Sequence, residues 1–287
     1  LPKEPILGLP DDWFVYMGGT CGGSTRDEHN YGNWQLANGD MNSDDDSHID
    51  IFNQFLLNKY GLSISYQEIK QAWMYHEVSD FGGGEGAIQV MRDKNLIAPQ
   101  CGQRDHGNSG HWLPESYIEA ETMGAAFPGM PFKASEMTDR FQRITGEGEN
   151  VEWGKYWASA HAIAYFESDA RVVIEKALGA MPANSRIRQM FDITKALFAK
   201  YPTDWRKANY DLWHNTPLSN PMSVGYNGVQ MLSDVNNGTG FLSIWYGAND
   251  YNRTLRIVTL AGGDGDCTAS SVCGIFGILK GMAGTPQ

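Results

Sequence analysis

Apolar residues recur at helical spacing along most of this 287-residue chain. The first regular stretch runs from Ile49 to Tyr60 and is followed by Gly61, a residue type that commonly ends a helix. Residues three or four positions apart share one face of a helix, so this stretch predicts an amphipathic helix. Its apolar face consists of Ile49, Ile51, Phe52, Phe55, Leu56 and Tyr60. Strand-like alternation is scarce, and only residues 256–260 are ambiguous.

A second helix is signalled directly after the first. Ser65-Tyr66-Gln67-Glu68 has the form of a capping box, Ile64 and Ile69 are placed as a hydrophobic staple, and the helix should run to about residue 77. Residues 98–114 have the composition of a long polar loop, a kind of segment that is often functional. Further helices are predicted at residues 85–95, 115–126, 132–143, 153–166, 168–178 (with Ser168 as N-cap), 184–200, 221–235, 239–246 and 267–283. We therefore predict an all-α, single-domain orthogonal helical bundle over residues 1–287, with an irregular N-terminal segment at 1–40.

The charge balance argues against two classes of partner. The formal net charge is −12 and there is no basic patch, so the chain gains no counterion-release attraction to nucleic acid. No apolar run approaches the ~20 residues that span a bilayer. We expect neither a nucleic-acid partner nor a membrane.

The four cysteines do not suggest a zinc site. Cys21, Cys101, Cys267 and Cys273 form no Cys-x-x-Cys pair and no Cys/His pairing. Cys267 and Cys273 are six positions apart in one predicted helix and therefore point in different directions. We expect the cysteines to act as small buried apolar residues.

Three consecutive aspartates, Asp44-Asp45-Asp46, stand just before the helix at Ile49. Free amides and the helix dipole stabilise acidic residues at a helix N-terminus, which accounts for one or two of them. Three adjacent carboxylates repel one another, and a hard divalent cation would relieve that repulsion. Both interpretations stay open for this cluster alone.

A second acidic loop precedes the last predicted helix. In Gly262-Gly263-Asp264-Gly265-Asp266-Cys267 the glycines allow a tight turn from which both aspartates project. The loop is not an EF-hand, because Ile275 stands where the bidentate Glu belongs, and it lacks the Gly-Lys-Ser/Thr ending of a P-loop. The remaining alternative is an ordinary solvated turn.

Together the two clusters indicate more than either does alone. Each is a short acidic loop that leads into an apolar helix, and the two helices belong to opposite ends of the chain. If these helices pack side by side, five carboxylates converge, which is the composition of a two-metal site. We therefore expect a central acidic metal site in the bundle and a metal-dependent hydrolase.

These loops resemble those of the ADP-ribosylglycohydrolase family, which includes the dinitrogenase-reductase-activating glycohydrolases. That family carries a Thr-Asp-Asp-Thr-like loop before an early helix and a Gly-Gly-Asp-x-Asp-Thr/Cys loop before the last one. Asp45-Asp46-Ser47, or the frame one residue earlier, resembles the first loop, and residues 262–267 resemble the second. Segments at 95–99, 127–131, 180–185 and 245–251 also resemble family segments in the same order, so the likeness covers roughly residues 40–284.

The resemblance implies a glycosyl hydrolase with two Mg²⁺ or Mn²⁺ ions that cleaves the N- or O-glycosidic bond at C1″ of an ADP-ribosyl group. An anionic site would stabilise the positive charge that develops on the ribose. The substrate would be an ADP-ribosylated protein or a small ADP-ribosyl or ribosyl compound, and the enzyme a monomer. By motif position, Asp45, Asp46 and Asp264 would be catalytic. The metal ligands would be Ser43, Asp44, Asp45, Asp46, Asp264, Asp266 and Cys267, where Cys267 stands in place of the usual Thr.

Four residues are candidates for substrate binding: Glu147, Asn150, His111 and Gly265. His111 and its neighbour Trp112 end the long polar loop and could stack on an adenine, with ordinary packing as the alternative. Glu147 and Asn150 lie where many family members carry a His-x-x-x-Gly-like segment, and a solvated loop is the alternative there. Gly265 belongs to the second acidic loop.

Two other functions fit the same residues: a secreted glycosidase of this fold acting on another furanoside, and a non-catalytic ADP-ribose-binding module. The intact aspartates of both clusters favour the hydrolase over the binding module. The chain begins at Leu1 and carries sequons at Asn237 and Asn252, so a secreted or periplasmic location stays open beside the family's usual cytoplasmic one.

Overall fold

The structure is a computed structural model that describes residues 45–76, 82–113, 117, 120–218, 233–281 and 284. Across these residues it contains 12 α-helices, a few short 3₁₀ helices and no strands, which confirms the all-α prediction. No helix in this part of the chain is long and apolar enough to cross a bilayer. The predicted irregular segment at 1–40 lies outside the described residues.

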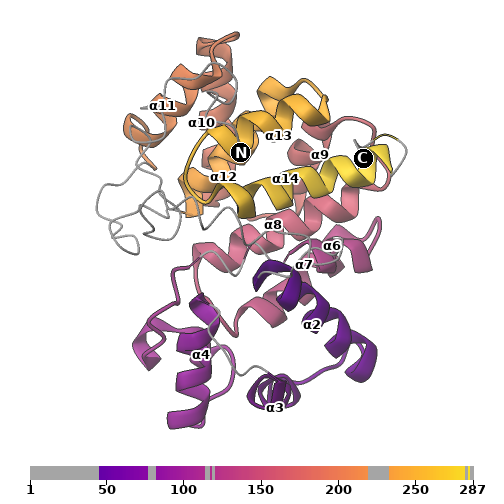
Figure 1. The fold of residues 1–287 in the computed structure, drawn as a ribbon, viewed down its shortest axis with the longest axis vertical. Helices are drawn as coiled ribbons and strands as arrows, with labels where there is room; N and C mark the ends of the chain where they lie inside the picture. Colours follow the sequence, from indigo (N-terminus) through magenta and orange to yellow (C-terminus); the bar gives the residue numbers. More distant parts are fainter. Residues whose placement is uncertain are drawn as a thin grey trace, which may run out of the picture.

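Helix α8 (Glu149–Ala164) occupies the centre of the bundle (Figure 1). It packs against α6 (Glu121–Ala126) and α7 (Pro131–Gln142) on one side, and against α12 (Ser233–Gly247) and α14 (Gly265–Lys280) on the other. Most residues of α8 are buried, so the helix has no solvent face of ordinary width. Helices from both halves of the chain therefore pack against α8.

The first three described helices lie together at one end of the molecule in Figure 1. They are α2 (Asp45–Tyr60), α3 (Tyr66–His76) and α4 (Gly82–Asp93). Helix α2 ends where the sequence predicts, because Gly61 adopts a left-handed φ of 71°. The Gly61 N–H then closes the helix on the carbonyl oxygen of Leu57 at 2.9 Å, as glycine commonly does at a helix C-terminus.

The predicted capping box at the start of α3 is confirmed. The Ser65 hydroxyl accepts from the Glu68 N–H at 3.2 Å, and the Glu68 carboxylate accepts from the Ser65 N–H at 2.8 Å. We expect Ser65→Ala to lower the free energy of unfolding by about 1 kcal/mol, because an orphan helix N–H loses its acceptor. Urea denaturation measures the loss. Ser63→Ala, at an exposed serine two residues earlier, is the control, and equal losses in both variants would refute the cap.

The polar loop predicted at 98–114 contains two short 3₁₀ helices, η4 (Gln100–Gly102) and η5 (Arg104–His106). A third, η6 (Leu178–Ala180), follows α9 (Ala170–Ala177). The predicted N-cap of α9 was wrong. Asp169, rather than Ser168, accepts the Arg171 N–H at 2.8 Å. A carboxylate competes well for a free helix amide.

The second half of the chain differs most from prediction. Helix α10 (Arg186–Lys200) forms where a helix was predicted at residues 184–200. Helix α13 (Tyr251–Leu260) includes the residues 256–260 that were ambiguous between helix and strand, and α11 (Trp205–His214) was not predicted. The helices predicted at 221–235 and 239–246 are not separate where the structure describes them. Residues 233–247 form one continuous helix, α12, and residues 221–232 lie outside the described part.

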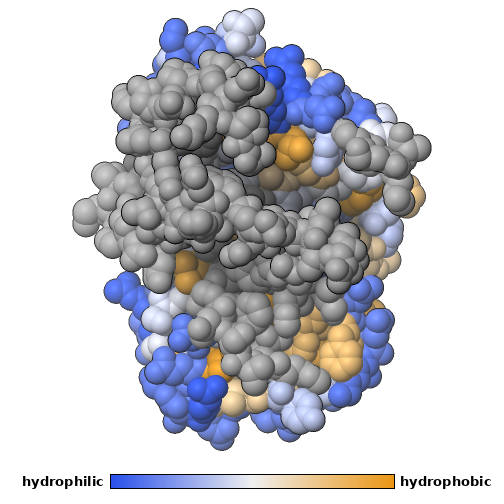
Figure 2. Space-filling model, viewed as in Figure 1, coloured by the Kyte–Doolittle hydropathy of each residue, from blue (hydrophilic) through white to orange (hydrophobic). Residues whose placement is uncertain are grey.

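Helix α12 packs through one phenylalanine into an aromatic core. Phe241 contacts rings from α8 and α10 at centroid separations of 5.3 to 5.9 Å. The rings meet in the edge-on and tilted geometries that aromatic pairs favour. The partners are Trp153, Tyr156, Trp157 and Phe191. Figure 2 shows hydrophilic side chains at both ends of the long axis, and hydrophobic side chains exposed in places between them and in the lower half of the view.

Candidate functional site

Asp264 is a buried carboxylate at the start of α14. It is the N-cap residue of that helix and only 5% exposed. Its backbone N–H donates to Oδ1 of Asn236 at 2.9 Å, and the Tyr117 hydroxyl donates to its Oδ2 at 3.4 Å. The Asn236 amide in turn donates to the Tyr117 hydroxyl at 2.7 Å. These three residues form a closed triangle of hydrogen bonds that fixes the second acidic loop.

The electrostatics of this triangle keep Tyr117 a donor. Burial raises the pKa of Tyr117 well above its ordinary value, and the negative charge of Asp264 raises it further. The phenol therefore stays protonated throughout the working range of pH. Gly263 gives the loop its left-handed turn, with a φ of 78°, a conformation that glycine adopts without strain. A β-carbon on Gly263 would lie 2.8 Å from the Trp213 ring.

The first turn of α12 connects the site to its surroundings. Its contributing side chains are Ser233, Asp234, Asn236 and Asn237. Asp234 accepts from the Trp153 indole N–H at 2.8 Å and from Nε of Arg186 at 2.6 Å. Ser233 donates to Asn150, and Asn237 accepts from the Trp157 indole. One helix start therefore holds α8, α10 and α14 in a fixed relation.

Glu121 of α6 joins the helices that carry the two acidic clusters. Its Oε1 accepts from the Ser270 hydroxyl of α14 at 3.1 Å, and its carboxyl interacts with the carboxyl of Asp50 on α2. Asp50 lies four residues after Asp46, and Ser270 lies four residues after Asp266. Because four residues are about one helical turn, Glu121 bonds to α14 and interacts electrostatically with α2 about one turn after the acidic start of each helix.

Three of the four predicted substrate-binding residues lie close together. The Asn150 amide donates to the carbonyl oxygens of His111 at 3.3 Å and Leu113 at 2.9 Å. Glu147 Oε1 lies 3.3 Å from His111 Nδ1 and accepts from the Arg104 N–H at 2.9 Å. Burial lowers the pKa of His111, although the Glu147 carboxylate partly offsets this. These bonds fasten the polar loop to the start of α8.

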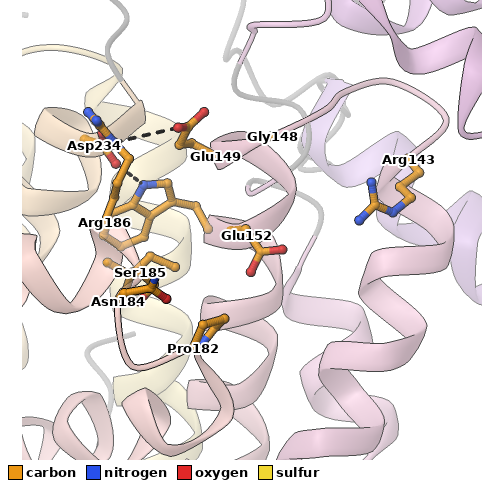
Figure 3. A pocket seen from close by; sticks show the side chains of 11 residues that line it. Arg143, Gly148, Glu149, Glu152, Pro182, Asn184, Ser185, Arg186 and Asp234 are labelled. Atoms are coloured by element: carbon orange, nitrogen blue, oxygen red, sulfur yellow. Dashed lines mark hydrogen bonds and ion pairs between the residues drawn. The ribbon is translucent and has the colours of Figure 1, made fainter.

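A cavity of about 380 Å³ opens between the starts of α8 and α10. Figure 3 shows Arg186 turned toward both Asp234 and Glu149, whose Oε1 lies 3.8 Å from Arg186 Nε. Glu152 and Arg143 line the opposite part of the same cavity. Its volume lies within the ~300–1,000 Å³ range of small-molecule sites, and its lining carries both signs of charge. Asp234 links this cavity to the Asn236 triangle through the first turn of α12.

The structure describes the side chains of only some of the predicted metal ligands. Asp45, Asp46 and Asp266 are helical, but their side chains lie outside the described part, as do Ser43 and Asp44 entirely. Among the side chains that are described, no three of His, Cys, Asp or Glu lie close enough to share a metal ion. Carboxylate and hydroxyl oxygens, the donor types of the predicted set, suit a hard divalent cation, and of the predicted aspartates the structure describes the side chain of the buried Asp264.

Sequence reasoning missed the residues that support this site. Tyr117, Glu121, Asp234 and Asn236 were not singled out, although each bonds across at least one helix boundary. The run Ser233-Asp234-Val235-Asn236-Asn237 carried a usable signal. Four polar residues at the start of an otherwise apolar helix need hydrogen-bond partners if that helix is buried.

The described part of the chain is an all-α bundle with a buried carboxylate, Asp264, at the start of its last helix. The family model for ADP-ribosylglycohydrolase matches residues 12–287, and the chain belongs to this family. It is therefore a glycohydrolase for ADP-ribosyl-type substrates. No curated protein and no solved structure is similar enough to the chain to count as a match.

Proposed function

We propose that the chain is a divalent-cation-dependent enzyme that hydrolyses the N- or O-glycosidic bond at C1″ of an ADP-ribosyl group, with two Mg²⁺ or Mn²⁺ ions. The observation that carries the proposal is the position of Glu121 between α2 and α14. Glu121 bonds to α14 and interacts electrostatically with α2 about one turn after each acidic start, which supports the idea that carboxylates from the two ends of the chain act at one place. The family supplies the substrate class.

The chemistry follows from the charge at the start of α14. Cleavage of the glycosidic bond leaves positive charge on the ribose, and the Asp264 carboxylate would stabilise it. Tyr117 and Asn236 hold that carboxylate and its loop in place, so little reorganisation is needed during the reaction. Asp45, Asp46 and Asp266 would add negative charge, and one of the aspartates would act as general base. Divalent cations, when bound, would orient and polarise substrate oxygens.

We propose that the larger part of the substrate binds in the cavity between α8 and α10. Arg186, Glu149 and Ser185 line it, and the charged groups suit hydrogen-bonding phosphate, hydroxyl and amide groups. His111, Glu147 and Asn150 form the neighbouring edge at the start of α8. We propose that this edge and the cavity together select the group attached to the ribose.

A turnover screen tests the proposal. The protein is incubated with Mg²⁺ or Mn²⁺ and with ADP-ribosylated arginine and serine peptides, O-acetyl-ADP-ribose and simple furanosides. We expect release of ADP-ribose, detected by mass spectrometry, that stops with EDTA and returns when cation is restored. Hydrolysis of furanosides alone would instead identify a glycosidase of this fold. Calorimetric binding of ADP-ribose without any turnover would identify a binding module.

A further inference from the structure

The loop between α13 and α14 carries Asp264, and buried asparagines hold it from both ends. Asn209 of α11 donates from its amide nitrogen to the carbonyl oxygen of Ala261 at 2.7 Å. Asn236 of α12 accepts from the Asp264 N–H at 2.9 Å. Both asparagines are only 1% exposed, so water does not compete for these bonds. The two bonds therefore fix the backbone on either side of the glycine pair in the loop.

The glycine pair makes such support necessary. Gly262 and Gly263 turn the chain left-handed, with φ values of 84° and 78°. Glycine adopts this conformation without strain but adopts many others as readily, so the pair does not by itself define the position of Asp264. A β-carbon on Gly263 would overlap Oδ1 of Asn236 and lie 2.8 Å from the Trp213 ring. The loop therefore passes between an amide and an indole that leave no room for a side chain.

A short chain of hydrogen bonds fixes the orientation of the Asn209 amide. The Trp213 indole N–H donates to the Thr239 hydroxyl at 3.3 Å. That hydroxyl shares its single hydrogen between Oδ1 of Asn209 at 3.3 Å and the carbonyl oxygen of Val235 at 3.2 Å. Because a carbonyl oxygen only accepts, the nitrogen of the Asn209 amide faces Ala261 and its oxygen faces Thr239. Asn209 and Trp213, about one turn apart on α11, therefore act on the loop together.

Helix α11 reaches the acidic loop from a different part of the bundle. It packs against α10 and α12, and Figure 1 shows it beside α10 at the upper left. The simplest alternative is that Asn209 only pairs the carbonyl of Ala261, the residue that ends α13, because the last carbonyls of a helix lack partners within it. That alternative explains one hydrogen bond. It does not explain why a second side chain of the same helix face, Trp213, packs on Gly263.

We propose that Asn209 is a positioning residue: through Ala261 it sets the backbone of the acidic loop, so that the Asp264 carboxylate is in place before a divalent cation binds. The inference rests on the proposed function, in which Asp264 is a cation ligand. A ligand that is fixed in advance loses less freedom on binding, so cation affinity should depend on Asn209 although this residue belongs to another helix. Residues that orient metal ligands typically contribute about 10–100-fold to metal affinity or activity.

Asn209→Ala removes both hydrogen bonds of this amide. We expect the affinity of the full chain for Mn²⁺, measured by titration calorimetry, to fall by about 10–100-fold. Turnover should fall most at limiting Mn²⁺ and should approach that of the parent at saturating Mn²⁺. The reason is that the Asp264 carboxylate is still present and is only less often in position.

Two controls separate positioning from a general loss of stability. Thr194→Ala deletes another fully buried polar group, whose hydroxyl accepts from the Trp245 indole of α12 at 3.4 Å. Asn215→Ala removes an exposed asparagine at the end of α11, which donates to the Asp211 carboxylate at 2.9 Å. Both variants should bind Mn²⁺ as the parent does, although Thr194→Ala should unfold at a lower urea concentration.

Hydrogen exchange of the cation-free protein tests the same inference without any cation. The Asp264 N–H is bonded to Asn236, so it should exchange slowly in the parent and in both controls. In Asn209→Ala it should exchange at least about tenfold faster, because the loop opens more often. Thr239→Val keeps the size of the side chain but removes the hydroxyl that faces Asn209. It should show a smaller change in the same direction, and it provides the test if Asn209→Ala does not fold.

The outcomes distinguish this inference from the proposed function. Equal Mn²⁺ affinity and equal exchange in the parent and Asn209→Ala would overturn the inference. So would a loss of affinity in Thr194→Ala as large as that in Asn209→Ala, because stability alone would then explain it. A parent that binds neither Mn²⁺ nor Mg²⁺ would refute the proposed function instead. The exchange comparison would then decide the inference, which faster exchange in Asn209→Ala supports and equal exchange overturns.

Discussion

Replacing Asp264 by asparagine is expected to reduce cation-dependent release of ADP-ribose by more than about 10²-fold. Asparagine keeps the size of the side chain and an acceptor for the Tyr117 hydroxyl, so the hydrogen-bonded triangle with Asn236 survives. It removes the negative charge, which the site needs both for ligating a divalent cation and for stabilising the ribosyl cation. The thermal stability of the cation-free protein should change only slightly.

The measurement for this variant is kcat at saturating Mg²⁺ or Mn²⁺, with cation affinity from titration calorimetry. Asp192→Asn is the matched control, since Asp192 is an exposed aspartate on α10. We expect the control to equal the parent in both quantities. Undiminished turnover in Asp264→Asn would show that the start of α14 is not the reaction centre. Loss of cation affinity with unchanged turnover would show that the cation bound through Asp264 is not required for hydrolysis.

The largest effect on stability is expected from Gly124→Ala. A β-carbon at this position of α6 would overlap the β-carbon of His161 and lie 2.8 Å from the carbonyl oxygen of Ala158. Both belong to α8, the buried central helix, whose backbone cannot move aside without disturbing the aromatic core. We expect the free energy of unfolding to fall by about 3 kcal/mol, as overpacking does in a dense core.

The control for this effect is Gly179→Ala in η6, where a β-carbon would meet nothing within 4 Å. An alanine in place of a glycine usually stabilises by reducing the freedom of the unfolded chain, so the control should equal or exceed the parent. Denaturation by urea at one pH compares the three proteins. If Gly124→Ala were as stable as Gly179→Ala, the close approach of α6 to α8 would be refuted.

Most helices were predictable because an amphipathic period and its caps are local properties. The box at Ser65 and the left-handed Gly61 are examples in which neighbouring residues determine the geometry. Helix α12 was split in prediction because it is buried on every side and therefore has no polar face to give a period. Helix α11 was missed, although Asp204 caps its start by accepting the Lys207 N–H at 3.2 Å.

The same distinction between local and long-range features decides which residues of the candidate site were predictable. Asp264 and its glycines were identified because a loop motif is written in consecutive residues. Tyr117 and Asn236 were not, because they reach Asp264 from positions 147 and 28 residues away along the chain. Glu121 depends on three helices meeting at one point, and a single sequence contains no signal for such a meeting. The ligand roles of Asp45, Asp46, Asp266 and Cys267 remain predictions.

The hydrogen bonds at the first turn of α12 have a consequence for how relatives of this protein can diverge. Asp234, Asn236 and Asn237 serve neighbouring helices, so a substitution there disturbs the interior before it alters what is recognised. The segment from Gln100 to Leu113 is different, because buried positions such as Cys101 and Asn108 anchor it while Arg104, Asp105, Gly107 and Ser109 are exposed. New specificities should therefore arise by substitution at the exposed positions of that segment, while its buried positions and the first turn of α12 are inherited unchanged.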